Sequence, residues 1–143
     1  MSKTLAEIKA AVWAHFQPGQ SVYLATAEGD QPRVRPITLL NLEEKFWIAT
    51  SPRSAKARQI LRNPNVEFCY PLTSDCGNGY IRVSGIATVV RDSEVIERIG
   101  NQIPFLVQYW TGTQDPNFCL IRITRVEIEY LEPGVMSPHT FIV

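Results

Sequence analysis

The chain has 143 residues, of which 45% are hydrophobic and 20% charged, and this is the size of one domain with a single sizeable core. Its 14 basic and 14 acidic residues give a formal net charge of zero, which argues against nucleic acid and membrane partners, because both select strongly basic surfaces. Three cysteines without a C-x-x-C pair and two histidines argue against a disulfide framework and a structural metal site. The sequence shows neither a signal peptide nor a long apolar run, so we expect a cytoplasmic protein.

The first element in chain order is an amphipathic helix within residues 1–17, where Thr4 and Glu7 have the spacing of a capping box. Two more helices are expected, one with Ser51 as its N-cap and Asn63 at its end, and one that begins at Asp92 or Ser93 and runs to Ile99. Runs rich in β-forming residues predict six strands, at residues 21–27, 33–40, 45–50, 66–70, 80–91 and 118–131.

Three further segments connect or follow these elements. The Gly-containing segment 74–79 is interpreted as a loop, and the apolar segment 105–110 fits neither a helix nor a strand clearly. Residues 132–143 show no strand pattern and are interpreted as a tail. Because the strands do not alternate regularly with helices, we expect a mainly β fold, a six-stranded antiparallel barrel with short helices outside it. The domain would comprise residues 1–143, with the helix in 1–17, the barrel in 21–131 and the tail in 132–143.

The segment ATSPRSAKAR, residues 49–58, places cations where acidic residues usually stand. A helix N-terminus carries partial positive charge and normally attracts Asp or Glu, yet this one carries Arg53, Lys56 and Arg58. A solvated basic helix face is one explanation. The other is an anionic ligand, and the neighbouring strand favours it, because Arg33 and Arg35 lie two residues apart and share one face.

Several segments together resemble the flavin-binding split barrels related to pyridoxamine 5'-phosphate oxidase. The segment 32–37, PRVRPI, is similar to the family's Pro-x-x-Arg-x-Val strand, and Thr50-Ser51 followed by Ser54-Ala55-Lys56 is similar to its phosphate-binding turn. Further matches follow in the same order, at Gln59, Asn63-Pro64, Val66 and Phe68, then at 82–87 and 115–124. The resemblance covers about Val22 to Leu131 and implies a split β-barrel that binds flavin mononucleotide (FMN).

The resemblance also implies which residues hold the cofactor. Arg35 would lie near the flavin phosphate, and the backbone of Pro36, Ile37 and Thr38 would meet the edge of the isoalloxazine ring. The phosphate itself would be bound by Thr50, Ser51, Ser54 and Lys56, with Arg53 replacing the Arg that this chain lacks at Ala55. The family's members are homodimers with flavin at the interface, and the candidates for completing the site from the second chain are Tyr80, Arg82, Tyr109 and Trp110.

The function expected from this resemblance is an FMN-dependent oxidoreductase that passes electrons from a reduced nicotinamide nucleotide to a small-molecule acceptor. Pyridoxamine phosphate oxidation itself is not expected, because an Arg- and Trp-containing segment that binds pyridoxal phosphate does not follow the last strand. The alternatives are a flavin carrier, store or stress-related sensor without turnover, a pocket that holds the deazaflavin F420 or haem, and a cofactor-free barrel that binds other proteins.

Overall fold

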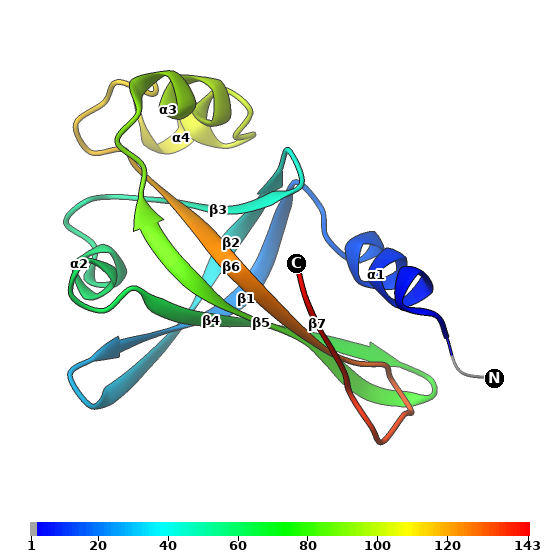
Figure 1. Ribbon diagram of the computed structural model, residues 1–143. Helices are drawn as coiled ribbons and strands as arrows, with labels where there is room; N and C mark the ends of the chain where they lie inside the picture. Colours follow the sequence, from blue (N-terminus) through cyan, green and yellow to red (C-terminus); the bar gives the residue numbers. More distant parts are fainter. Residues whose placement is uncertain (1–2) are drawn as a thin grey trace.

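The computed structural model describes residues 3–143 and has four helices and seven strands in this range (Figure 1). The helices are α1 (Leu5–Ala14), α2 (Ala55–Arg62), α3 (Ser93–Gly100) and α4 (Leu106–Tyr109). The strands are β1 (Gly19–Glu28), β2 (Gln31–Leu42), β3 (Lys45–Thr50), β4 (Asn65–Ser74), β5 (Gly77–Val89), β6 (Cys119–Leu131) and β7 (His139–Ile142).

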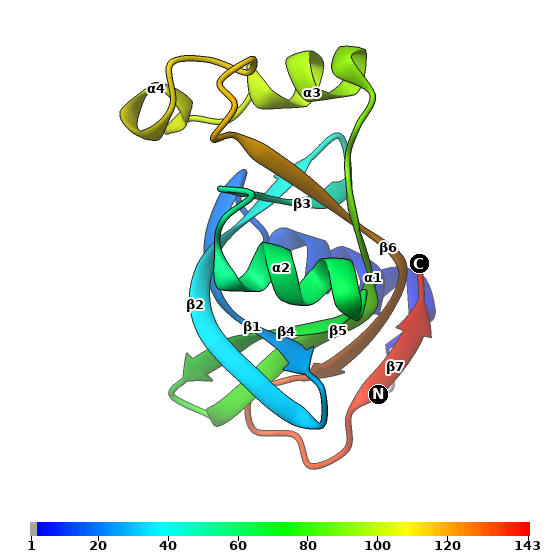
Figure 2. The same cartoon turned by 90° about the vertical axis from the view of Figure 1, so that its left-hand side faces the viewer.

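Six of the strands form the expected barrel. They are hydrogen-bonded in the order β3-β2-β1-β4-β5-β6, all antiparallel, and the additional pairing of β3 with β6 closes the ring. β7 pairs with residues 127–130 of β6. The helices lie outside, with α1 at one end of the barrel, α2 across its side, and α3 and α4 together over the β3 end (Figures 1 and 2). The split-barrel prediction is confirmed.

The structure corrects three local predictions. Helix α2 is capped by Ser54, not Ser51, because the Ser54 hydroxyl accepts the backbone N–H of Ala57 and residues 51–53 form a turn before it. The segment 74–79 belongs mostly to the β4–β5 hairpin, whose strands end at Ser74 and begin at Gly77. The tail 132–143 contains a strand, β7, which is held by pairing with β6 and by burial of Phe141. The undecided segment 105–110 contains the short helix α4.

Two other helix starts are as the sequence predicts. Thr4 and Glu7 form the reciprocal capping box of α1, and the Asp92 side chain accepts the backbone N–H of Glu94 at the start of α3. No described helix is both long and apolar enough to cross a membrane.

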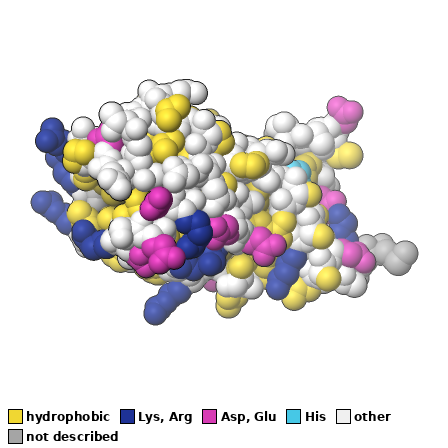
Figure 3. Space-filling model, turned by 90° about the horizontal axis from the view of Figure 1, so that it is seen from above, with side chains coloured by type: hydrophobic (Ala, Val, Ile, Leu, Met, Phe, Trp, Pro, Cys, Tyr) yellow, Lys and Arg dark blue, Asp and Glu magenta, His cyan; other side chains and the backbone are white. Residues whose placement is uncertain are grey.

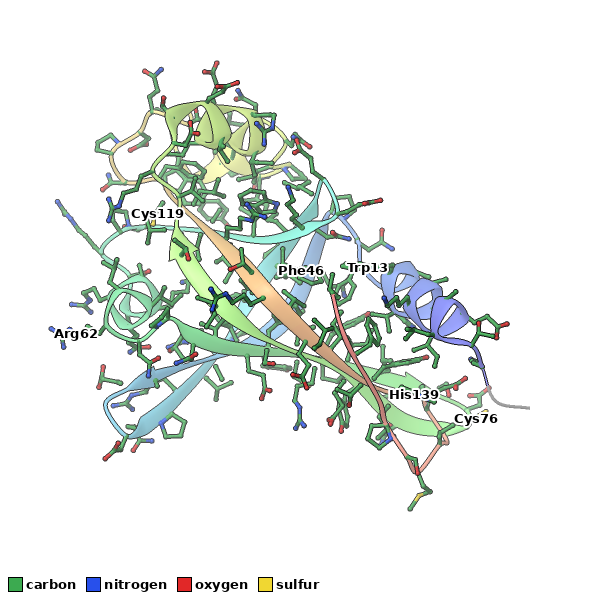
Figure 4. The ribbon with its side chains drawn as sticks, in the orientation of Figure 1. Trp13, Phe46, Arg62, Cys76, Cys119 and His139 are labelled. Carbon is green, nitrogen blue, oxygen red and sulfur yellow. The ribbon has the colours of Figure 1, made fainter. Side chains whose placement is uncertain are left out.

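The core consists of two apolar clusters on the two sides of β3. Phe46 and Ile48 point into the barrel, while Trp47 belongs to a second cluster beneath α3 and α4. The barrel interior includes an aromatic group in which the ring centroid of Phe46 lies 5.3 Å from Trp13, 5.1 Å from Phe16 and 5.3 Å from Phe68. Figure 4 shows Phe46 and Trp13 between the barrel and α1. Because β3 is buried on both faces, its position is fixed from both sides, and the chain leaves it at Thr50 in a defined direction.

Phe46→Ala is expected to lower the free energy of unfolding by about 3–5 kcal/mol, because it removes a fully buried ring and leaves a cavity among three other aromatic side chains. Urea denaturation followed by fluorescence measures this change. The matched control is Val107→Ala, at a side chain that is 80% exposed, where a change of about 0.5 kcal/mol or less is expected. Equal effects of the two substitutions would contradict the assigned core.

Candidate functional site

A cleft of about 430 Å³ lies where β2, the end of β3, the start of α2 and the region of α4 meet. It contains seven of the residues that the sequence proposes for the cofactor together with three others. The lining residues are Pro36, Ile37, Thr38, Ala49, Thr50, Ser51, Lys56, Phe105, Tyr109 and Trp110. The sheet topology therefore brings together the two segments that the sequence analysis connected, 35–38 and 50–56.

The start of α2 forms the polar end of the cleft. Ser54 caps the helix through Ala57, and the Thr50 hydroxyl donates to the Ser54 hydroxyl at 3.0 Å. The N–H groups of the first helical residues, Ala55 and Lys56, have no acceptor within the helix. Together with the helix dipole they favour an anion at this position.

Lys56 is the cation that lines the cleft at this helix start. Its side chain is partly buried, and it forms no ion pair with any residue of the described range 3–143. Burial, and secondarily the charge of Arg35, lower the pKa of Lys56 below its ordinary value. A partly desolvated ammonium group without a carboxylate partner is electrostatically unfavourable, and a bound anion would relieve this.

Arg35, in contrast, is held by protein acceptors. Its guanidinium donates to the Thr26 hydroxyl at 2.8 Å, to the Gln59 side-chain carbonyl at 2.7 Å and to the Leu24 carbonyl at 3.3 Å. Thr26 and Gln59 are themselves buried, and the Thr26 hydroxyl donates to the same Gln59 oxygen. Burial, and then the neighbouring Arg33, lower the pKa of Arg35, but a guanidinium stays protonated. The network fixes a positive charge between β1, β2 and α2, beside Lys56.

Aromatic side chains form the opposite wall of the cleft. The Trp110 indole N–H donates to the Asn117 carbonyl at 2.8 Å, and its ring centroid lies 5.0 Å from that of Phe118. Tyr109 is 70% exposed at the mouth of the cleft, and its ring contacts both Phe105 and Trp110. These contacts hold Trp110 in place, so the cleft presents a fixed aromatic surface across from its cationic end.

The backbone of β2 forms the floor. Residues 31–38 of β2 pair with β1 on one side only, because β3 pairs with β2 from Leu39 onward. In an antiparallel edge segment the backbone groups of every second residue point away from the partner strand, so part of the backbone within 36–38 is available to a ligand. Pro36 fits here, since it cannot donate to a strand on the open side.

Four other candidate residues lie outside the cleft. Arg33 is exposed and forms an ion pair with Glu28 at 3.1 Å, and Arg53 is exposed in the turn before α2. Arg82 pairs with Glu129 at 2.6 Å, and Tyr80 donates to the same carboxylate. Both lie toward the β4–β5 turn, so within one chain they do not meet the cleft. Tyr109 and Trp110, which the sequence analysis assigned to the second chain, line the cleft of their own chain.

The sequence analysis missed three residues of the site. Ala49 and Phe105 line the cleft, and Gln59 holds Arg35. For Gln59 a signal was present, since it is a polar residue that stands beside Ile60 on the buried side of α2. Phe105 carried no such signal, because its position depends on how α4 packs over β3.

Comparison with known proteins places the chain in a family. The family model for pyridoxamine 5'-phosphate oxidase matches residues 8–132. The chain belongs to the pyridoxamine 5'-phosphate oxidase family. The chain is similar to General stress protein 26 of Bacillus subtilis (strain 168). The two are 29% identical over 118 residues, which cover 80% of this chain and 81% of that protein.

Solved structures agree with this assignment. A NimC/NimA family protein from Clostridium acetobutylicum superposes with a TM-score of 0.75 at 29% identity, covering 94% of this chain and 91% of that one. A haem-binding protein from Mycobacterium smegmatis reaches a TM-score of 0.75 at 14% identity, covering 99% of this chain and 59% of that one. At that identity the likeness is one of fold alone. The fold of this chain is thus shared with proteins of other printed descriptions.

Gln59→Met is expected to lower the free energy of unfolding by about 1–3 kcal/mol, because it leaves the Arg35 guanidinium and the Thr26 hydroxyl without a shared acceptor. Urea denaturation measures the effect. In the double variant Arg35→Met/Gln59→Met the two losses should not add, since one interaction is removed in both single variants. Strict additivity would show that the network contributes no coupling.

Proposed function

We propose that this member of the oxidase family binds FMN in the cleft and acts as an oxidoreductase. The observation that carries the proposal is the combination of a partly buried, unpaired Lys56 at a helix N-terminus with an aromatic wall across the same cleft. A flavin mononucleotide has the matching parts, a phosphate dianion at one end and a planar ring at the other.

The residues of the cleft have separate roles in this proposal. The Lys56 ammonium and the free N–H groups of α2 bind the phosphate, while the Ser51, Thr50 and Ser54 hydroxyls add hydrogen bonds. Arg35 adds positive charge from its fixed position behind them. Trp110 and Phe105 exclude water from one side of the ring, and the free backbone groups of 36–38 meet its edge.

The bound flavin supplies the redox chemistry, the transfer of a hydride or of single electrons. The protein therefore needs no nucleophile, and the donors that it presents tune the flavin by stabilising negative charge on the reduced ring. We propose a reduced nicotinamide nucleotide as the hydride donor and a small quinone-like or nitroaromatic molecule as the acceptor, which takes up two electrons together with protons. We also propose a homodimer, a cytoplasmic location and a single domain.

Haem is the second group to be weighed, because one structural neighbour is a haem-binding protein. The commonest haem ligand is histidine, and both histidines of this chain lie outside the cleft. His15 packs near the rings of Tyr70 and Tyr130, and His139 lies in β7. The cleft instead offers an ammonium, hydroxyls and backbone N–H groups, which supports a phosphate-bearing cofactor.

The first experiment is the visible spectrum of the purified protein, with FMN added if it is colourless, followed by gel filtration. Retained flavin bands support the proposal, whereas a haem spectrum or no retained flavin overturns it. Steady oxidation of NADH or NADPH in the presence of menadione or a nitroaromatic compound then separates an oxidoreductase from a carrier, store or sensor.

Lys56→Met is expected to weaken FMN binding by about 1.5–3 kcal/mol, about 10- to 150-fold in Kd, because it removes a charge-assisted hydrogen bond to the phosphate. Fluorescence titration of the apoprotein measures the affinity. Lys45→Met is the matched control, since Lys45 is exposed at the start of β3 and outside the cleft. An unchanged Kd in the Lys56 variant would remove this residue from the phosphate site.

The affinity for FMN is expected to depend on pH through Lys56. Below the pKa of Lys56 in the free protein, and above the second phosphate pKa of about 6, the ammonium and the phosphate dianion are both present before binding, so the affinity is constant. Above this pKa, which is lower than that of an ordinary lysine, binding has to take up a proton and the affinity falls as pH rises. Titrations between about pH 7 and pH 10 measure this fall. It should be absent in Lys56→Met, and a fall that persists there would assign it to another group.

A further inference from the structure

A second cavity lies along α2 on the side away from the cleft, and we call it the α2 groove. It is bounded by Glu28 and Gly29 of the β1–β2 turn and by Arg58, Gln59 and Arg62 of α2. Its volume is about 550 Å³, larger than that of the cleft. This volume is within the range of pockets that hold small molecules, and the proposed flavin site does not include the groove.

The charges of the α2 groove favour an anion. Arg58 and Arg62 are exposed, lie four residues apart on one helix face and form no ion pair with residues 3–143. Figure 4 shows Arg62 projecting from α2 away from the barrel, and Figure 3 shows Lys and Arg side chains gathered at this end of the molecule. The groove's carboxylate, Glu28, is engaged by Arg33 at 3.1 Å and by the Gln59 amide at 3.2 Å. These hydrogen bonds lower the pKa of Glu28, so it is ionised at neutral pH.

The α2 groove and the cleft meet at the first turn of α2. Ala55 lines the groove and the next residue, Lys56, lines the cleft. Gln59 lines the groove and also holds Arg35, which lies beside Lys56. An anion bound at this turn is therefore situated beside lining residues of both spaces.

The remaining surface of the α2 groove fits a nucleoside. Ala27, Gly29 and Ala55 are small, and they leave room for a planar base. The Glu28 carboxylate is an acceptor for ribose hydroxyls, the role that acidic residues have in many nucleotide sites. Two guanidinium groups one helical turn apart suit phosphate oxygens, which they bind through paired N–H groups.

We propose that the α2 groove binds an adenosine phosphate group, with its phosphate oxygens on Arg58 and Arg62 and its ribose at Glu28. The inference rests on the proposed function in one respect, because that function places a flavin phosphate at Lys56, beside the groove. Two sources carry this chemistry, the adenylate half of flavin adenine dinucleotide and the adenosine diphosphate half of the nicotinamide donor.

The test is calorimetric titration with ADP at about 0.15 M salt, where long-range charge effects are screened. The protein is titrated as the apoprotein and after loading with FMN. Arg58→Ser/Arg62→Ser is expected to weaken ADP binding more than about tenfold, because it removes both phosphate ligands. Lys45→Ser/Arg91→Ser removes the same charge from exposed positions outside the groove and the cleft, and it should leave the affinity within about twofold. Circular dichroism checks that each variant is folded.

The affinities for FAD and FMN identify the source. If the wild type binds FAD much more tightly than FMN, ADP competes with FAD, and the arginine variant loses the preference, the groove holds the flavin's own adenylate. If FAD and FMN bind equally and ADP binds the FMN-loaded protein, the groove holds the adenosine diphosphate half of the nicotinamide donor. The absence of ADP binding in the wild type, or equal binding by the arginine variant, overturns the proposal. Since the ADP titration of the apoprotein needs no flavin, a failure to bind FMN overturns the proposed function separately.

Discussion

The pairing of β3 with β6 is the constraint on which the rest of the structure depends. It runs from Phe46 opposite Ile123 to Thr50 opposite Cys119 and closes six strands into a ring. These partners are far apart in sequence, so the closure depends on contacts that only the folded chain makes. Because the pairing ends at Thr50, it fixes where the chain turns into α2 and where α4 can pack over β3. The cleft is a consequence of that closure.

Lys56, which lines the cleft, and Arg35, which lies beside it, differ in how their charges are compensated. Arg35 donates to three protein oxygens, and this compensates for part of its burial. Lys56 has no such acceptor among residues 3–143, and its lowered pKa means that the folded chain holds its proton less tightly than the unfolded chain. The contribution of Lys56 to stability therefore improves as pH rises from the lowered folded pKa toward the ordinary value. A fold that retains such a charge is poised to gain stability from an anion.

Much of the barrel could be predicted from the sequence, because its strands carry their patterns locally. The continuous apolar run 46–49 indicates a strand buried on both faces, and Pro36 indicates that its part of β2 is paired on one side only. The N-cap of α2 could not be fixed locally, since Ser51 and Ser54 both fit. The choice depends on the Thr50–Ser54 hydrogen bond and on the turn in which the Ser54 N–H donates to the Ser51 carbonyl.

The residues of the cleft also divide into those that the sequence predicts and those that only packing brings there. Lys56, Thr50 and Ser51 could be found because their types and spacing are unusual at a helix start, whereas Phe105 and Ala49 join them only through packing. β7 was missed for a related reason, since a four-residue strand with one buried side chain, Phe141, has too little pattern to be distinguished from a tail. Contacts between distant segments, not local preferences, decide these elements.

Helical geometry divides the basic residues of α2 between two faces of the helix. At 3.6 residues per turn, Arg58 and Arg62 share a face, while Lys56 lies on the opposite side from Arg58. The two cavities follow this division, with Lys56 in the cleft and both arginines along the α2 groove. A single phosphate at the helix start cannot neutralise both faces. An anion at the helix start faces Lys56, so the two arginines would need a second anionic group on their own face of α2, which is the place of the proposed adenosine phosphate.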